Sequence, residues 1–470
     1  MLFPTLDFGL FFLLVFALAW GLKDWNTGRK LVLVVASYAF YAYWDWRFCG
    51  LLLASSLLNH AAGLVIGNSN DPRIRRRIVV LAITANLGIL GFFKYYDFFI
   101  VSLNDLAFSF GLQRELPFLE VILPVGISFF TFQGISYVVD VYRRDVRPQT
   151  SLLNLLLYIS FFPQLVAGPI VRASVFMPQI EQPPRPDRIL ASLGLLLIVV
   201  GLFKKMVVAN YLATEMVDWV FLDPIFYGAG DLTLGVYGYA IQIYCDFSAY
   251  SDIAIGVAAL LGFRFQKNFN QPYRAQSLQD FWRRWHISLS TWLRDYLYIP
   301  LGGSRGGTRS TGRNLLLTML LGGLWHGAAW NFILWGALHG GGLVVERMVG
   351  WARDRGRRPL WRRVLATLLV FHFVCVTWIL FRSTDMLLAF DYLTGLSRFG
   401  EPMEFATPLI LSLITIGFAM HFIPGDSLER MERWVRPVPL WLQGLVCGIA
   451  IVAIDAVGPE GVAPFIYFQF

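Results

Sequence analysis

Two histidines in apolar or aromatic surroundings could carry out chemistry. His326 lies in the run Gly-Leu-Trp-His-Gly at 323–327, and His286 follows the run Phe-Trp-Arg-Arg-Trp at 281–285. An ionisable side chain inside an apolar segment is costly and marks a functional site by default. An ordinary imidazole, with a pKa of about 6.5, can act as a general acid or base at neutral pH. We therefore predict that His326 is catalytic and that His286 is a second titratable group near the mouth of the same cavity. The alternative for each is a structural histidine satisfied by one hydrogen bond.

Arginines and tryptophans beside these histidines could bind a substrate. Segment 281–301 contains Arg283, Arg284 and Arg294, so it is too polar to span lipid, yet it is too aromatic for an ordinary loop. Its guanidinium groups could hold the phosphates of a donor through charge-assisted hydrogen bonds. The alternative is an interfacial belt with snorkelling charges. Trp325 could separate the pocket from lipid.

The other ionisable residues of the apolar segments are expected to be structural. Asp246 and Asp252 could form a proton relay, but we favour ion pairs with arginines of the following loop. His339 is expected to pack against a neighbouring helix. The four cysteines lie far apart without the spacing of zinc ligands, so we predict neither a metal site nor a disulfide framework. We find no motif for nucleotide hydrolysis, redox or serine-hydrolase chemistry.

The elements that position these residues are predicted to lie in a membrane. The chain is 56% hydrophobic and only 15% charged, whereas about 25% of the residues of soluble proteins are charged. This composition indicates a polytopic membrane protein and excludes disordered, collagen-like and nucleic-acid-binding proteins. Basic cytoplasmic loops account for the net charge of +8 without an acidic partner.

The lengths of the apolar runs predict an all-α polytopic membrane protein with about 10–12 transmembrane helices, because a hydrocarbon core about 30 Å thick requires about 20 residues per helix. The candidate spans are 5–22, 30–46, 48–66, 78–96, 118–140, 188–210, 232–262, 314–328, 330–346, 363–382, 405–424 and 438–457. The first span ends in Lys23 without a small-residue cleavage site nearby, so we expect a membrane helix rather than a cleaved signal.

The distribution of basic residues predicts the orientation of these spans. Arginines cluster in the loops 67–77, 141–150 and 347–363, and such loops face the cytoplasm. Both termini are therefore expected outside. Segment 262–313 is basic as well, so the apolar segment 314–346 must enter and return on the same side as a hairpin.

Two stretches are not simple spans. Segment 152–171 contains Pro163, Gly168 and Pro169 and is predicted to be re-entrant, and segment 281–301 is the polar aromatic stretch described above. Irregular backbone at membrane depth is tolerated only where protein buries it or where it lines a wet cavity. We therefore expect re-entrant segments around a central cavity open to the cytoplasm, within a single domain over 1–470. We find no internal repeat.

Several motifs together resemble the membrane-bound O-acyltransferase (MBOAT) family. They are Asp-Phe-Ser-Ala-Tyr-Ser-Asp at 246–252, Asn-Phe-Asn-Gln-Pro-Tyr at 268–273, Phe-Trp-Arg-Arg-Trp-His-Ile-Ser-Leu-Ser at 281–290, Arg-Asp-Tyr at 294–296, Pro-Leu-Gly-Gly at 300–303 and Gly-Leu-Trp-His-Gly at 323–327. Residues 120–345 correspond to the family core. The chain most resembles the bacterial branch that contains AlgI, the membrane subunit of alginate O-acetylation, and more distantly DltB.

The resemblance implies the MBOAT fold, a tunnel reached from both sides of the membrane, and a catalytic histidine at His326 with the second family histidine at His286. By the same resemblance the predicted substrate-binding residues are Trp325, Arg283, Arg284, Arg294, Asp295, Tyr296 and Asn268. No bound cofactor is expected, because acetyl-CoA or another acyl thioester would serve as the donor substrate.

The implied function is O-acetylation of an exopolysaccharide, most simply alginate, by a multi-pass protein of the bacterial inner membrane. The implied partners are the lipid bilayer, a periplasmic or membrane-anchored SGNH-type acetyltransferase and an acyl carrier protein, with no nucleic acid. Cellulose, teichoic acid or peptidoglycan are alternative polymers. A proton-coupled transporter or flippase and a non-catalytic scaffold are rival classes, although a transporter would need paired repeats that this chain lacks.

Overall fold

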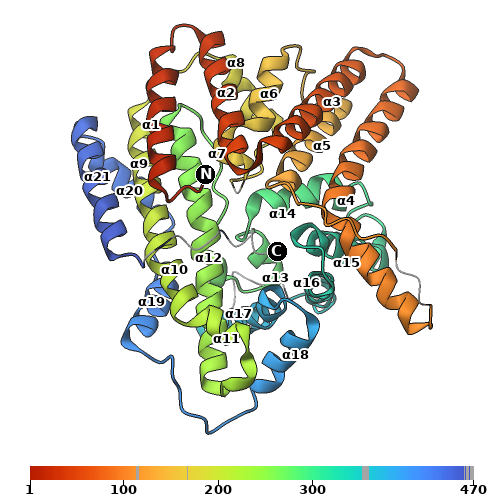
Figure 1. Ribbon diagram of the computed structural model, residues 1–470, viewed down its shortest axis with the longest axis vertical. Coiled ribbons are helices and arrows are strands. Elements are labelled where there is room, and N and C mark those ends of the chain that lie inside the picture. The colour runs from red at the N-terminus through yellow and green to blue at the C-terminus, as the bar shows by residue number, and fades with distance from the viewer. Residues whose placement is uncertain (113–115, 167, 352–358, 460, 462–464, 466–470) are drawn as a thin grey trace. The chain divides into compact units, whose positions relative to one another are not determined.

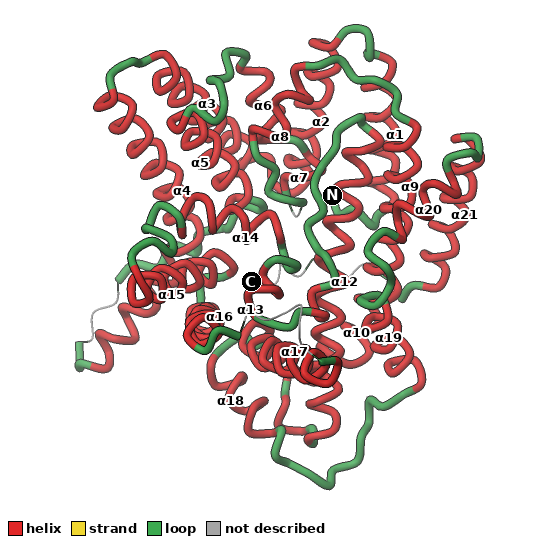
Figure 2. Tube along the Cα trace, turned by 180° about the vertical axis from the view of Figure 1, so that it is seen from behind, coloured by secondary structure: helices red, strands yellow, loops and turns green. Residues whose placement is uncertain are grey.

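The computed structural model describes residues 1–112, 116–166, 168–351, 359–459, 461 and 465, and these residues form helices and loops without a strand (Figure 1, Figure 2). Each predicted span coincides with a helix, so the all-α polytopic fold is confirmed. Six helical segments among the described residues are long and apolar enough to cross a membrane, namely Asn26–Asn68, Pro72–Ser109, Arg188–Leu222, Ala229–Leu260, Leu360–Arg382 and Leu440–Val457.

Contacts divide the chain into two compact units, each described separately below; the single domain over 1–470 stays a prediction. The first unit contains residues 1–186 and 261–265. Its helices are α1 (Leu6–Gly21), α2 (Asn26–Asp45), α3 (Cys49–Asn68), α4 (Pro72–Ser109), α5 (Ile127–Arg143), α6 (Leu152–Ser160), α7 (Phe162–Leu165) and α8 (Ala173–Glu181).

Two features of the first unit differ from or refine the expectations. Helix α5 was expected from residue 118 but begins at Ile127, because Pro117 and Pro124 favour extended backbone and Gly126 adopts a positive φ of 77°. Segment 152–171 breaks into α6 and α7, with Pro163 inside the short α7. The broken character of this segment is therefore as expected.

The second unit contains residues 187–260 and 266–470 and holds both histidines singled out above. Its long helices are α9 (Arg188–Leu202), α12 (Ala229–Leu260), α15 (Gly307–His326), α16 (Trp330–Met348), α17 (Leu360–Arg382), α19 (Pro408–Ala419) and α21 (Leu440–Val457). Its short pieces are α10 (Asn210–Leu212), α11 (Asp218–Leu222), α13 (Leu278–Trp282), α14 (Ile287–Leu293), α18 (Met386–Gly395) and α20 (Ser427–Val435). Helix α12 is buried along almost its whole length, whereas α21 exposes nearly all its apolar side chains, as a helix facing lipid does.

A π-helical segment, η2 (Phe203–Ala209), explains how two consecutive lysines both reach α12. Lys204 Nζ lies 2.5 Å from Asp252 Oδ2, and Lys205 Nζ lies 2.7 Å from Asp246 Oδ1. In a regular α-helix consecutive side chains point about 100° apart, and the wider π turn brings them closer to one face. The expected ion pairs with arginines of the loop 262–313 were therefore wrong, because lysines of a preceding helix are the partners.

The predicted hairpin of 314–346 consists of α15 and α16, which pack tightly against each other. A Cβ at Gly336 would overlap the carbonyl oxygen of Met319, and one at Gly323 would overlap that of Phe332. Small residues at these positions let the two backbones approach closely, as in other membrane helix pairs. The hairpin thus fixes where His326, the last residue of α15, lies relative to α16.

Candidate functional site

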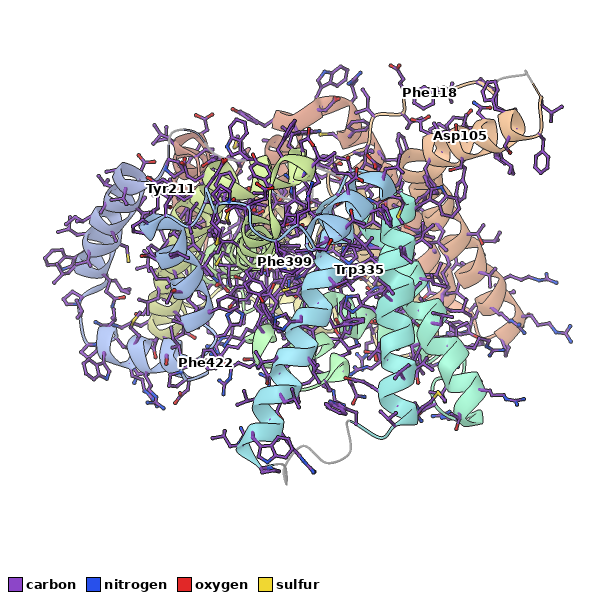
Figure 3. All side chains as sticks on the ribbon, turned by 90° about the horizontal axis from the view of Figure 1, so that it is seen from below. Asp105, Phe118, Tyr211, Trp335, Phe399 and Phe422 are labelled. Carbon is purple, nitrogen blue, oxygen red and sulfur yellow. The ribbon has the colours of Figure 1, made fainter. Side chains whose placement is uncertain are left out.

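His326 is enclosed by aromatic side chains of its own hairpin and of α17. Its imidazole is 4% exposed and lies 5.1 Å from the ring centroids of both Trp325 and Trp335 and 5.2 Å from that of Phe381. Figure 3 labels Trp335, which belongs to α16 and is fully buried. Gly327, directly after His326, leaves space that the ring of Phe332 fills. Because Gly323 and Gly327 have no side chain, Phe332 in the first turn of α16 can lie directly against the end of α15.

His286 is held at a sharp bend between α13 and α14. Its φ of 43° and ψ of 56° place it in the left-handed region, which is uncommon for a residue with a side chain. Such strain persists only where the surroundings enforce it, and it is frequent at functional sites. The bend turns the imidazole into the interior of the unit, where it is fully buried. Because its neighbour Ile287 lines the cavity described below, the position of His286 near the mouth of a cavity stays a prediction.

Asn268 determines which nitrogen of His286 carries a hydrogen. The Asn268 Oδ1 atom accepts hydrogen bonds from the Ser288 amide at 3.1 Å and hydroxyl at 2.9 Å, and it lies 3.3 Å from His286 Nδ1. Because an amide oxygen can only accept, this contact favours a hydrogen on Nδ1, and the Ser288 hydroxyl lies 3.4 Å from the same nitrogen. Burial lowers the pKa of the His286 imidazole, so the ring is neutral at pH 7. Its Nε2 atom then presents a lone pair, and this atom has no hydrogen-bond partner within the described chain.

Trp325 connects the two histidines. Its ring centroid lies 5.9 Å from that of His286 and 5.1 Å from that of His326. Phe247 of α12 packs against the other side of His286 at 4.6 Å and contacts Phe465 at 5.7 Å. The predicted catalytic pair therefore shares one buried aromatic environment from which bulk water is excluded.

A cavity of about 530 Å³ opens beside this environment. Its walls come from α13, α14, the π-helical segment η6 (Arg294–Tyr298) and the hairpin, and include Trp282, Arg283, Ile287, Arg294, Tyr298, Thr318, Met319, Glu346 and Arg347. The Trp282 ring contacts Trp335 at 5.6 Å, and Trp335 contacts His326. Two of the three predicted arginines, Arg283 and Arg294, thus line a cavity that is separated from His326 by two tryptophans.

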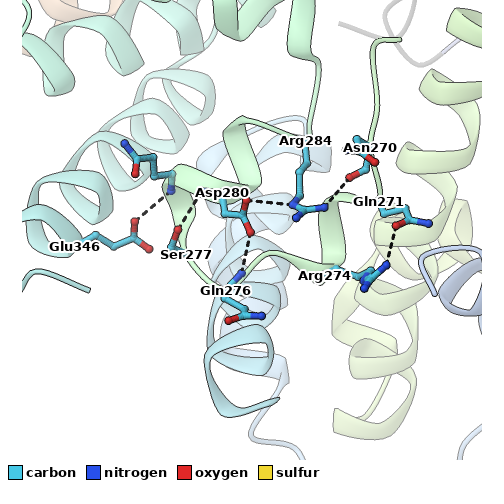
Figure 4. A network of polar contacts seen from close by, with 9 residues as sticks. Asn270, Gln271, Arg274, Gln276, Ser277, Asp280, Arg284 and Glu346 are labelled. Atoms are coloured by element: carbon cyan, nitrogen blue, oxygen red, sulfur yellow. Dashed lines mark hydrogen bonds and ion pairs between the residues drawn. The ribbon is translucent and has the colours of Figure 1, made fainter. Parts of the chain in front are cut away.

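The third arginine, Arg284, belongs to a polar network that shapes this region (Figure 4). Its Nε lies 3.1 Å from Asp280 Oδ1, and its Nη1 donates to the carbonyl oxygen of Asn270 at 3.3 Å. Glu346 accepts hydrogen bonds from the amides of Leu278 and Gln279 at the start of α13. Arg284 is absent from the cavity wall, and its contacts are those of a residue that anchors the loop after Asn268.

Asp295 and Tyr296 of η6 contact their own neighbours. Asp295 Oδ1 lies 2.6 Å from Arg294 Nε, and the Tyr296 ring lies 5.2 Å from that of Trp292. Arg294 keeps 59% of its side chain exposed at the cavity. The structure therefore gathers Trp325, His286, His326 and Asn268 in one place and puts Arg283 and Arg294 in the adjoining cavity.

Sequence reasoning missed several residues of this environment. His339, expected only to pack, places its Nε2 atom 3.0 Å from the Thr377 hydroxyl and its ring 4.6 Å from Trp335. The ring centroid of His421 lies 4.3 Å from that of Tyr244. The tryptophans and Phe381 come from separate helices, so no local motif joins them. In the described part of the chain no three His, Cys, Asp or Glu residues are grouped as metal ligands would be.

Comparisons with known proteins identify the family of this chain. The profile of the membrane-bound O-acyltransferase family, MBOAT, matches residues 141–390. A probable alginate O-acetylase, AlgI, of Pseudomonas putida is 38% identical over 94% of this chain and 94% of its own length. The corresponding protein of Azotobacter vinelandii is 45% identical over 79% of this chain and 73% of its own. A peptidoglycan O-acetyltransferase of Helicobacter pylori is 38% identical over 78% and 73%, respectively.

Proposed function

The chain belongs to the membrane-bound O-acyltransferase family and is a multi-pass O-acetyltransferase of the bacterial inner membrane, and on this basis we propose that it passes acetyl groups from a cytoplasmic thioester to an exopolysaccharide outside. The observation that carries the proposal is the buried pair His286 and His326 on either side of Trp325, next to a cavity lined with arginines.

Alginate is the proposed polymer. The two AlgI relatives named above support it, because one of them aligns with nearly the whole chain. The Helicobacter pylori relative acts, by its name, on peptidoglycan and supplies the second candidate. Cellulose and teichoic acid remain weaker alternatives.

We propose that His326 is the general base. Its imidazole takes the proton of the acceptor hydroxyl while the hydroxyl oxygen attacks the thioester carbonyl; a C–O bond forms, the C–S bond breaks, and the released thiolate recovers the proton. Such proton transfer typically raises the rate of a reaction by about 10²–10⁴-fold. His326 ends α15, and the partial negative charge of a helix C-terminus favours the positive charge that develops on the ring.

His286 is proposed to position the acceptor. Stabilising an oxyanion requires a hydrogen-bond donor, whereas the Nδ1–H group of His286 is directed to Asn268 and its Nε2 atom carries a lone pair. Accepting a hydrogen bond from a sugar hydroxyl suits this tautomer. This arrangement therefore supports positioning of the acceptor rather than oxyanion stabilisation.

The cavity of about 530 Å³ is the proposed donor site. It adjoins Arg347 and Gly350 at the end of α16 that precedes the basic loop 347–363, which is predicted to be cytoplasmic. Arg283 and Arg294 would hold phosphates there. Acetyl-CoA carries such phosphates, and an acyl carrier protein presents its thioester on a phosphorylated arm. A separate SGNH-type acetyltransferase is the proposed partner that completes transfer to the polymer.

Replacing His326 tests the proposal. His326→Gln should abolish polymer acetylation in cells and transfer from radiolabelled acetyl-CoA by the purified protein, while membrane levels stay normal. His60→Gln, the same change in a histidine of the first unit, serves as the control. Normal acetylation in the His326 variant would refute the mechanism, and polymer movement without acetyl transfer by the wild type would favour a transporter.

Charge reversal at Arg294 tests the donor site. Arg294→Glu should raise the KM for acetyl-CoA at least tenfold, because it places a second carboxylate beside Asp295 where phosphates would bind. The thermal midpoint of the purified protein should change little, since the side chain is largely exposed. Unchanged donor KM would mean that these arginines form only an interfacial belt.

A further inference from the structure

A second cavity, of about 300 Å³, lies elsewhere in the second unit and shares no residue with the proposed donor site. Its lining residues come from α11, the end of α17 and α18, which are grouped at the lower end of this unit in Figure 1: Asp218, Trp219, Phe221, Leu222, Arg382, Thr384 and Leu388. The volume is at the small end of the range for ligand sites, about 300–1,000 Å³. It suits one sugar unit of a chain that continues into solvent.

The predicted topology places this cavity on the outer side of the membrane. Helix α17 begins at Leu360, next to the basic loop predicted to be cytoplasmic, and ends at Arg382. Its 23 residues span about 35 Å at 1.5 Å per residue, which exceeds the thickness of the hydrocarbon core. The lining residues Arg382 and Thr384 therefore lie at the face opposite to the donor cavity.

Trp219 provides a flat apolar wall in a fixed orientation. Its ring is 57% exposed, and its Nε1–H group donates to the carbonyl oxygen of Thr214 at 2.9 Å. The C–H bonds on one face of a sugar ring carry small positive partial charges and can rest on the negative face of an indole. Little side-chain entropy would be lost on binding, because the indole is already held in place.

Arg382 provides a positive charge that is only partly satisfied. Its Nη2 atom lies 2.8 Å from Asp218 Oδ1, and its guanidinium carbon lies 6.0 Å from the centre of the Phe221 ring. Its Nε atom is buried and has no acceptor among the described residues, so a ligand would meet the terminal nitrogens of the guanidinium. A planar guanidinium with donors to spare is suited to a carboxylate. Asp218, whose side chain is 45% exposed, can accept hydrogen bonds from sugar hydroxyls.

A lining residue of the cavity is the neighbour in sequence of a residue that packs against His326. Phe381 precedes Arg382 and packs against the His326 imidazole at 5.2 Å between ring centroids. Arg382, which lines the second cavity, therefore directly follows a residue of the His326 enclosure. Trp282, which lines the proposed donor cavity, reaches the same enclosure through its contact with Trp335.

We infer that this cavity is a binding subsite for an acidic sugar unit of the polymer, with Trp219 stacking on the ring and Arg382 pairing with its carboxylate. This inference rests on the proposed function and names the class of acceptor, a hexuronate polymer, that the site would select. The pair would favour hexuronate units over neutral sugars, because a carboxylate forms charge-assisted hydrogen bonds with the guanidinium that the hydroxyl of a neutral sugar does not match.

Binding of a linear hexuronate tetrasaccharide to the full chain in lipid nanodiscs, measured by calorimetry, tests the subsite. The wild type should bind this probe at least tenfold more tightly than the carboxyl-reduced tetrasaccharide. Trp219→Ala and Arg382→Gln should each weaken binding of the uronate probe at least tenfold. Phe226→Ala is the control, because Phe226 is 79% exposed near α11 yet does not line the cavity.

Further variants separate the possible causes of a loss. The double exchange Asp218→Arg with Arg382→Asp keeps an ion pair with the two charges swapped. It should restore the thermal midpoint but not uronate binding. If binding also recovers, the pair is only structural and the inference is overturned. Equal affinity for the two probes would overturn it as well. Lost polymer acetylation with unchanged probe binding would assign the cavity to a protein partner instead. The His326→Gln variant should still bind the uronate probe. If this variant also retained acetylation, the proposed function would be refuted, whereas the subsite would not be affected.

Discussion

At the scale of single residues, the site depends on how Asn268 orients His286. One amide oxygen accepts hydrogen bonds from the Ser288 amide and hydroxyl and fixes the tautomer of the imidazole. The amide nitrogen of Asn268 donates to the Ser251 hydroxyl at 3.0 Å, which anchors the side chain to α12. Asn268 is therefore a positioning residue, since it reaches the reaction only through His286.

Asn268→Ala should lower the rate of acetyl transfer at least tenfold. The change removes the oxygen to which the part-buried Ser288 amide and hydroxyl donate, which lowers stability, and it frees the imidazole to rotate. Asn268→Asp keeps an oxygen at the same place and should recover most of the rate. Initial rates and thermal midpoints of the two purified variants check this. If the aspartate variant recovers stability but not rate, the orientation of His286 is unimportant.

At the scale of elements, the hairpin of α15 and α16 determines where the catalytic residue lies. Close approach of the two backbones at Gly323 and Gly336 brings Trp335 and Phe332 to the end of α15. A larger residue would push the helices apart and would open the aromatic enclosure of His326. The packing of this hairpin is thus a condition of the chemistry.

Gly336→Ala should destabilise the protein by about 1–3 kcal/mol, as overpacking does, because the added methyl group overlaps the carbonyl oxygen of Met319. Gly341→Ala in the same helix is the matched control. A Cβ there meets no atom within 4 Å, and alanine favours a helix over glycine by about 1 kcal/mol. Thermal midpoints in detergent should therefore fall for the first variant and hold or rise for the second. Equal midpoints would contradict the packing argument.

At the scale of the whole molecule, the arginine loops predict the orientation in the membrane. The two cavities of the second unit would then open to opposite compartments, one for the donor and one for the polymer. This arrangement requires the predicted orientation of the protein in the membrane. It also requires that segment 314–346 enters and returns on the same side.

Cysteine labelling should confirm this orientation. Single cysteines at Arg76, Asp145 and Val349, in a chain lacking its four native cysteines, should react with a membrane-impermeant maleimide only after the cells are opened. Cysteines at Phe226 and Phe399, which are 79% and 84% exposed, should react in intact spheroplasts. Labelling of position 349 from outside would show that 314–346 crosses an odd number of times.

The amino-acid sequence by itself determined the membrane class, the positions of the spans and the hairpin, because the length of an apolar run and the placement of arginines act locally. The resemblance carried by its motifs also identified the family correctly. Only the tertiary structure decided the partners of Asp246 and Asp252, since the register of a π-helical segment depends on packing against α12. It likewise decided that His286 is fully buried, and that residues from α11 and α17 meet at a second cavity. These are contacts between segments distant in the chain, and no local pattern of residue types specifies them.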